Sequence, residues 1–252
     1  MSALFSLQGK TALVTGASRG LGQAIAIALA AAGARVLCAS SSAAGSYETV
    51  AAIQQQGGES LALAADLSDE TAVRALAAAA TEQGAVDILV NCGGTIFRAP
   101  ADEFPMDAWR KVMAVNLDAA FLLSQLLGRD MIARKQGKII NIASMLSYSG
   151  GITVPAYTAS KHAIAGVTKA LANEWAKHNI QVNAIAPGYF RTDNTAALQA
   201  DEARNAAILD RIPAGQWGEP ADLAGAAVFL ASAASQYVNG HVLAVDGGWL
   251  AR

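Results

Sequence analysis

The protein has 252 residues, of which 53% are hydrophobic and 15% are charged. This composition excludes an intrinsically disordered chain and supplies enough apolar side chains for a substantial core. The formal net charge at pH 7 is −2, so no surplus of basic residues is available to neutralise a phosphate backbone. We therefore expect no nucleic-acid partner.

The cysteines, the N-terminal residues and the apolar runs all favour a cytoplasmic protein. Cys38 and Cys92 lie far apart and form neither a metal motif nor a disulfide framework, which is typical of a reducing compartment. The first ten residues lack the basic-then-apolar order of a signal peptide. Gly, Arg or Gln interrupts each apolar run, such as 24–34, before it reaches the ~18 residues of a membrane span. We expect no membrane partner and no bound metal.

Short β-branched runs alternate with longer alanine-rich helical patterns along the whole chain. Strands are predicted at 11–15, 35–39, 60–64, 87–91, 138–142, 181–186 and 241–245. Helices are predicted at 20–32, 47–56, 70–83, 106–134, 156–178 and 221–233. This alternation indicates an α/β fold with a parallel sheet covered by helices on both faces. About seven strands favour one doubly wound, Rossmann-type domain over residues 1–252 rather than a TIM barrel.

The segment 189–212 breaks the alternation of strands and helices. It follows a predicted strand, contains two short polar helical stretches and ends before Pro213. An insertion at the carboxyl end of a strand is where an α/β enzyme places a lid over its substrate. A surface loop without a function is the alternative.

Three glycines, Gly16, Gly20 and Gly22, lie between the first predicted strand and the first predicted helix. Glycines at this junction let the backbone turn tightly and approach a pyrophosphate, while the helix amides face the anion. The pattern predicts a dinucleotide site, with a plain helix-entry turn as the alternative.

The residues after the second predicted strand bear on which dinucleotide is bound. NAD-preferring enzymes of this fold usually carry an acidic residue there, whereas this chain has Ser40 and Ser41. No carboxylate therefore repels a 2′-phosphate, and the serine hydroxyls and Arg19 could bind it. The alternative is that Arg19 simply points to solvent. We expect NADP(H), with NAD(H) possible.

Tyr157 and Lys161 are four residues apart at the start of a predicted helix, so they share one face. A phenol with its ordinary pKa of about 10 is a poor base at neutral pH. A neighbouring ammonium, together with the positive nicotinamide ring of a bound cofactor, is expected to lower that pKa. Ser144 follows the fifth predicted strand and can hold a substrate oxygen while Tyr157 exchanges a proton. The three residues predict catalysis of alcohol–ketone interconversion.

The glycine spacing combined with Ser144, Tyr157 and Lys161 resembles the short-chain dehydrogenase/reductase family over nearly the whole chain. The resemblance implies that Asn116 is a fourth catalytic residue, which supports a proton relay. It also implies a homotetramer, which agrees with apolar residues on several sides of the helical patterns 106–134 and 156–178. Cys92 and Gly93 depart from the family's Asn-Asn-Ala-Gly turn. Matching cofactor-binding positions are Ser18, Leu21, Asp66, Leu67, Asn91, Gly93, Pro187, Gly188 and Thr192, with Tyr157 and Lys161 contributing as well.

A narrower resemblance bears on the substrate. The stretches 141–147, 172–180, 208–215 and 245–252 resemble the 2-dehydro-3-deoxy-D-gluconate 5-dehydrogenases and the 2-deoxy-D-gluconate 3-dehydrogenases. This resemblance implies a sugar-acid substrate, whose carboxylate suits a guanidinium fork. Arg98 and Arg204 match arginines of those enzymes and rank above Arg191. Substrate contacts are expected from Arg98, Ser144, Met145, Tyr157, Tyr189 and Arg204.

Three other functions stay open at this point. An NADPH-dependent reductase of a keto-uronate fits the serines that replace the acidic residue of NAD enzymes. A 3-oxoacyl-thioester reductase would need a basic surface for an acidic carrier protein, and the net charge gives no sign of one. A nucleotide-sensing scaffold is disfavoured by the intact set of Ser144, Tyr157 and Lys161.

Overall fold

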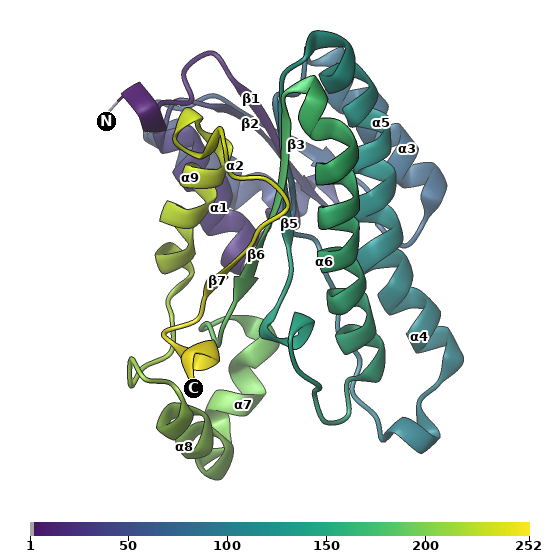
Figure 1. The fold of residues 1–252 in the computed structure, drawn as a ribbon, viewed down its shortest axis with the longest axis vertical. Coiled ribbons are helices and arrows are strands. Elements are labelled where there is room, and N and C mark those ends of the chain that lie inside the picture. The colour runs from purple at the N-terminus through teal and green to yellow at the C-terminus, as the bar shows by residue number, and fades with distance from the viewer. Residues whose placement is uncertain (1–2) are drawn as a thin grey trace.

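A single seven-stranded parallel sheet forms the centre of the protein (Figure 1). The computed structural model describes residues 3–252. The strands follow the order β3-β2-β1-β4-β5-β6-β7, and every neighbouring pair is parallel. This confirms the doubly wound fold. The order reverses between β1 and β4, which is where such sheets bind ligands beyond the strand ends. The strands are β1 Thr11–Thr15, β2 Arg35–Ser40, β3 Ser60–Ala64, β4 Ile88–Asn91, β5 Gly137–Ile142, β6 Ile180–Pro187 and β7 Val242–Val245.

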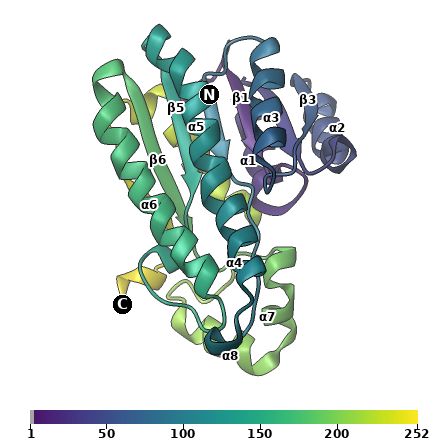
Figure 2. The same ribbon diagram turned by 90° about the vertical axis from the view of Figure 1, so that its right-hand side faces the viewer.

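Helices cover both faces of the sheet (Figures 1 and 2). Helices α1, α2 and α9 lie on one side, and α3, α4, α5 and α6 lie on the other. The predicted helix 106–134 is divided by a π-helical segment, Ala114–Asp118. The α-helices are α1 Gly20–Ala31, α2 Tyr47–Gln55, α3 Glu70–Glu82, α4 Met106–Met113, α5 Ala119–Arg134, α6 Pro155–Trp175, α7 Ala196–Ala200, α8 Glu202–Arg211 and α9 Ala224–Ala231.

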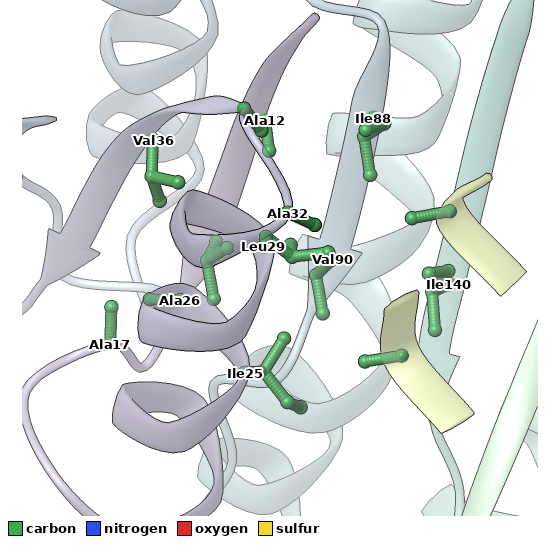
Figure 3. Packing of buried hydrophobic residues seen from close by; sticks show 14 of the residues in the cluster. Ala12, Ala17, Ile25, Ala26, Leu29, Ala32, Val36, Ile88, Val90 and Ile140 are labelled. Carbon is green, nitrogen blue, oxygen red and sulfur yellow. The ribbon is translucent and has the colours of Figure 1, made fainter. Parts of the chain in front are cut away.

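The core is divided into two apolar layers by the sheet. In β1, Val14 packs toward α1 and α9, whereas Leu13 packs toward the opposite helices. Ile25 and Leu29 of α1 are fully buried against the strands (Figure 3), and each contributes about 1.5–3 kcal/mol. Because both faces are packed, the carboxyl ends of the strands are held in fixed positions.

One helical run among residues 3–252, Met106–Arg134, is long and apolar enough to span a membrane by length and composition. This run consists of α4, the π-helical segment and α5, which continue into one another. In this fold Leu123, Leu127 and Met131 of α5 are buried beneath the sheet.

The segment 189–212 folds beyond the carboxyl end of β6, as the sequence predicts. It contains the two short helices α7 and α8, which lie below the sheet in Figure 1. Ile208 of α8 is buried in a third apolar cluster, together with Trp217 and Trp249. The segment is thus anchored to the domain by its own apolar residues.

Candidate active site

The glycine loop brings the backbone of β1 close to that of β4. Gly16 has a φ of +67°, and a Cβ at this position would lie 2.8 Å from the Cα of Gly93. A Cβ at Gly22 would lie 2.1 Å from the carbonyl oxygen of Gly16. Helix α1 begins without a side-chain cap, so its first amides are available to an anion.

Two cavities adjoin this loop. The first, which we call the glycine-loop cavity, measures about 230 Å³. The second, the serine cavity, measures about 380 Å³ and shares Gly16, Ser18, Gly94 and Thr95 with the first. Together they run from the strand ends to the edge of the sheet. Predicted residues line both: Ser18, Arg19, Gly20, Leu21, Gly22, Tyr157, Lys161 and Thr192 the first, and Ser40, Ser41, Asp66, Leu67 and Gly93 the second.

Asn91 occupies a different place from the one expected for a cofactor contact. Its side-chain amide donates to the Asn141 Oδ1 at 2.8 Å and to the Ser124 Oγ at 3.2 Å, and the residue lines neither cavity. The turn after it is held instead by the Thr15 hydroxyl, which accepts from the amides of Cys92 and Gly93. Asn91 therefore ties β4 to its neighbours inside the fold.

Arg19 and the two serines do not converge on one point. The Arg19 Nε lies 3.1 Å from the Asp193 Oδ2 across the mouth of the glycine-loop cavity, with both side chains more than 70% exposed. The Ser40 hydroxyl donates to the Ser42 carbonyl and accepts from Ser46, so it is committed within its own turn. Ser41 is exposed on the wall of the serine cavity.

Ser144, Tyr157 and Lys161 meet where β5 and α6 adjoin. The Lys161 ammonium donates to the Ile142 carbonyl at 2.6 Å and lies 5.4 Å from the centroid of the Tyr157 ring. Ser144 begins the turn after β5, and its hydroxyl accepts from the Leu146 amide at 3.1 Å. Ser144 and Tyr157 lie close enough for the serine hydroxyl to lower the pKa of the phenol. The predicted trio is assembled.

Burial controls the proton affinities in this group. It raises the pKa of Tyr157 above its ordinary value, while the Ser144 hydrogen bond and the charge of Arg98 act in the opposite direction. Burial also lowers the pKa of Lys161 to about 8. The net shift is upward because desolvation of the phenol outweighs the Ser144 hydrogen bond and the charge of Arg98. At neutral pH the phenol is protonated.

Asn116 lies in the π-helical segment, which turns its side chain into the protein. Its amide oxygen accepts from the Thr95 amide at 2.8 Å, and its amide nitrogen donates to the Thr95 carbonyl and to the Ser160 hydroxyl. The Ser160 hydroxyl donates in turn to the Tyr157 carbonyl at 2.8 Å. Asn116 is 3% exposed and connects the strand-end loop to the helix that carries Tyr157.

A third cavity of about 430 Å³, the arginine cavity, adjoins the other side of Tyr157. All six expected substrate-binding residues line it: Arg98, Ser144, Met145, Tyr157, Tyr189 and Arg204. Pro187 and Gly188, which were expected to bind the cofactor, lie in this wall as well. Arg191 does not, because it pairs with Glu219 at 2.9 Å outside the cavity.

Several wall residues were not among the predicted site residues. Cys92 lines the glycine-loop cavity instead of serving only as core, and burial raises the pKa of its thiol to about 11. Lys111 lies in the serine cavity and Arg211 in the arginine cavity. Asn194 borders both the glycine-loop and the arginine cavity. Lys111, Arg211 and Asn194 are typical surface residues in the sequence, and only the position of Cys92 between Asn91 and Gly93 indicated a place near the cofactor.

The comparisons with known proteins agree with this geometry. A family model described as enoyl-(acyl carrier protein) reductase matches residues 16–250. The chain belongs to the short-chain dehydrogenase/reductase family. Within the family it is 56% identical to 2-dehydro-3-deoxy-D-gluconate 5-dehydrogenase of Bacillus subtilis, over 98% of this chain and 97% of the relative.

Two solved structures extend the comparison to bound ligands. One from Agrobacterium tumefaciens is described as a 2-deoxy-D-gluconate 3-dehydrogenase with bound NADP; it is 55% identical, covers 99% of each chain and has a TM-score of 0.93. The other is a gluconate 5-dehydrogenase from Burkholderia cenocepacia in complex with NADP and tartrate. It is 41% identical, covers 99% of this chain and 98% of its own, and has a TM-score of 0.95.

Proposed function

We propose that the protein is an NADP(H)-dependent oxidoreductase that interconverts a secondary alcohol and a ketone of a sugar acid, of the 2-dehydro-3-deoxy-D-gluconate or 2-deoxy-D-gluconate type. The observation that carries the proposal is the position of Tyr157, which belongs to the wall of both the glycine-loop cavity and the arginine cavity. A group placed there reaches a cofactor on one side and an acidic substrate on the other. The names of the relatives support this substrate class.

The first two cavities fit a nicotinamide dinucleotide. A Cβ at Gly16 or Gly22 would collide with backbone atoms, so the loop can adopt this conformation only with glycine at both positions. The first turn of α1 has no side-chain cap, so its free amides suit the pyrophosphate. Ser41 and Arg19 would bind the 2′-phosphate once Arg19 leaves Asp193. Asp66 and Leu67 would contact the adenine; Pro187, Gly188 and Thr192 would contact the nicotinamide carboxamide; Lys161 would bind the ribose. The bound nicotinamide supplies the hydride acceptor or donor.

In this mechanism Tyr157 is the general acid or base that transfers the proton to or from the reacting oxygen. Ser144 holds that oxygen while Tyr157 donates a proton to the ketone in reduction, or removes one from the alcohol in oxidation. The raised pKa of the phenol means that Tyr157 of the free enzyme carries the proton that reduction of a ketone requires.

Asn116 and Lys161 support that proton transfer. The Lys161 ammonium is held by the Ile142 carbonyl beside the phenol. Asn116 acts by positioning, since its bonds to Thr95 and Ser160 fix the start of α6 on which Tyr157 lies.

Three further expectations accompany the proposal. The segment 189–212 acts as a lid, because it contributes Asn194 and Arg204 to the arginine cavity and Asp193 to the glycine-loop cavity. The protein is a homotetramer, in line with exposed apolar side chains such as Phe121 of α5; a monomer by light scattering would contradict this. Free thiols at Cys38 and Cys92 suit the cytoplasm.

A substrate panel tests the proposal. We would measure kcat/KM for 2-dehydro-3-deoxy- and 2-deoxy-gluconate-type acids with NADP and with NAD, and for an acetoacetyl thioester with NADPH. The proposal predicts turnover concentrated on the sugar acids and faster with NADP. A higher kcat/KM for the thioester would refute the sugar-acid substrate class, but it would not refute the assignment of the catalytic residues.

A further inference from the structure

The wall of the arginine cavity has an unbalanced positive charge. It contains Arg98, Arg204 and Arg211 but no aspartate or glutamate. Within residues 3–252, none of the three arginines forms an ion pair with a carboxylate. A concave site with several cations and no internal counter-charge attracts an anionic ligand.

The three arginines come from two parts of the chain. Arg98 lies in the segment between β4 and α4, and its guanidinium donates to the Asn194 carbonyl at 3.3 Å. Arg204 and Arg211 lie on α8, two turns apart on the face that also carries Ala207 and Ile208. This face is thus a stripe with a guanidinium at each end and apolar side chains between them.

Arg211 is held in place far more firmly than Arg204. Its guanidinium carbon lies 4.0 Å from the centroid of the Trp249 ring, a stacked geometry in which the in-plane N–H groups remain free. The C-terminal residue, Arg252, donates to the carbonyls of Arg211 and Asp210, which the end of α8 leaves without helical partners. The Ala214 amide also donates to the Gly247 carbonyl at 2.9 Å. The chain terminus therefore fixes the end of α8.

We infer that Arg211 is the principal carboxylate-binding residue for the substrate, and that Trp249 positions it. The inference rests on the proposed sugar-acid function and adds to it the residue that selects for the acid. A guanidinium that is already stacked loses little conformational freedom on binding a carboxylate bidentately.

The test compares an acidic substrate with its neutral counterpart. We would measure kcat and KM of the wild type, Arg211→Met and Arg211→Lys for a sugar acid and for its methyl ester. Loss of a charge-assisted pair predicts that Arg211→Met raises the KM for the acid about 10–150-fold, with kcat changed less than about threefold and the ester unaffected. Arg211→Lys should recover part of the loss. The matched control is Arg110→Met, because Arg110 is an exposed arginine of α4 that pairs with Asp107. This variant should change neither kcat nor KM for either substrate.

Trp249 is tested through its conservative replacement. Trp249→Leu removes the stacking surface and should raise the KM for the acid about 3–30-fold, whereas Trp249→Phe should restore most of the affinity. The assignment of Arg211 would be overturned if Arg211→Met and the wild type had a similar KM for the acid. It would also be overturned if Arg211→Met raised the KM for the acid and for the ester equally. Absence of sugar-acid turnover by the wild type would instead refute the proposed function.

Discussion

The ion pair between Arg19 and Asp193 leads to a sharp prediction about cofactor choice. Replacing Arg19 with Ala should weaken binding of NADP while leaving NAD nearly unchanged, because only NADP carries the 2′-phosphate that Arg19 is proposed to bind. Replacing Asp193 with Asn should strengthen the binding of NADP, because it removes the carboxylate that now pairs with the Arg19 guanidinium at 3.1 Å.

The exposure of the two side chains sets the magnitudes. Arg19 and Asp193 are 75% and 72% exposed, so their ion pair contributes only about 0–1 kcal/mol. A charge-assisted bond to phosphate contributes about 1.5–3 kcal/mol. Arg19→Ala is therefore expected to raise the Kd for NADP about 10–100-fold, and Asp193→Asn to lower it no more than about fivefold.

Titration calorimetry of each cofactor, without substrate, measures both constants. Arg74→Ala is the matched control, because Arg74 forms an exposed ion pair with Glu70 on α3 and lines neither the glycine-loop nor the arginine cavity. If Arg19→Ala weakened NAD and NADP equally, the residue would be contacting a group that both cofactors share, and the reasoning on the 2′-phosphate would be wrong.

Three further predictions concern catalysis, the glycine loop and pH. Tyr157→Phe should keep the wild-type Kd for NADP and lose at least about 10²–10⁴-fold in kcat; comparable turnover would remove Tyr157 as the acid. Gly22→Ala places a Cβ 2.1 Å from the Gly16 oxygen and should cost about 1–3 kcal/mol of unfolding free energy, whereas Gly225→Ala in α9, where no atom is within 4 Å, should cost nothing. Burial lowers the pKa of Lys138 from 10.5 to about 8, so the folded state binds fewer protons than the unfolded state between those values and gains stability as pH rises. The stability advantage of Lys138→Met over wild type in urea should therefore be larger at pH 7 than at pH 9.5; an advantage that stays constant would contradict this.

Hydrophobic patterning predicted the fold almost completely. Strands covered on both faces are apolar throughout, so β1 and β3 were located at their observed ends, and the other strands within one residue. The π-helical segment at Ala114–Asp118 was not predicted. Its shifted hydrogen bonds leave the pattern of apolar residues continuous from Met106 to Arg134, so nothing in the sequence marks the interruption.

The site was only partly predictable, and burial explains the difference. The glycine loop and the trio of Ser144, Tyr157 and Lys161 have fixed spacing, and the structure assembles them. The raised pKa of Tyr157 depends on how deeply the phenol is buried in the fold. The spacing of residues in the sequence does not predict this depth. The position of the Arg211 guanidinium depends on its contact with Trp249. The two residues are distant in sequence, and only the folded C-terminal segment brings them together.

Deuteride transfer tests the central claim most directly. NADPH carrying deuterium at the reactive C4 position would be incubated with the wild type and the ketone form of the sugar acid, and the product analysed by NMR. We predict deuterium at the new carbinol carbon, and a rate at least about 10²-fold lower in Tyr157→Phe. NADPH consumed without deuterium in the sugar acid, or full transfer by Tyr157→Phe, would contradict the proposed oxidoreductase.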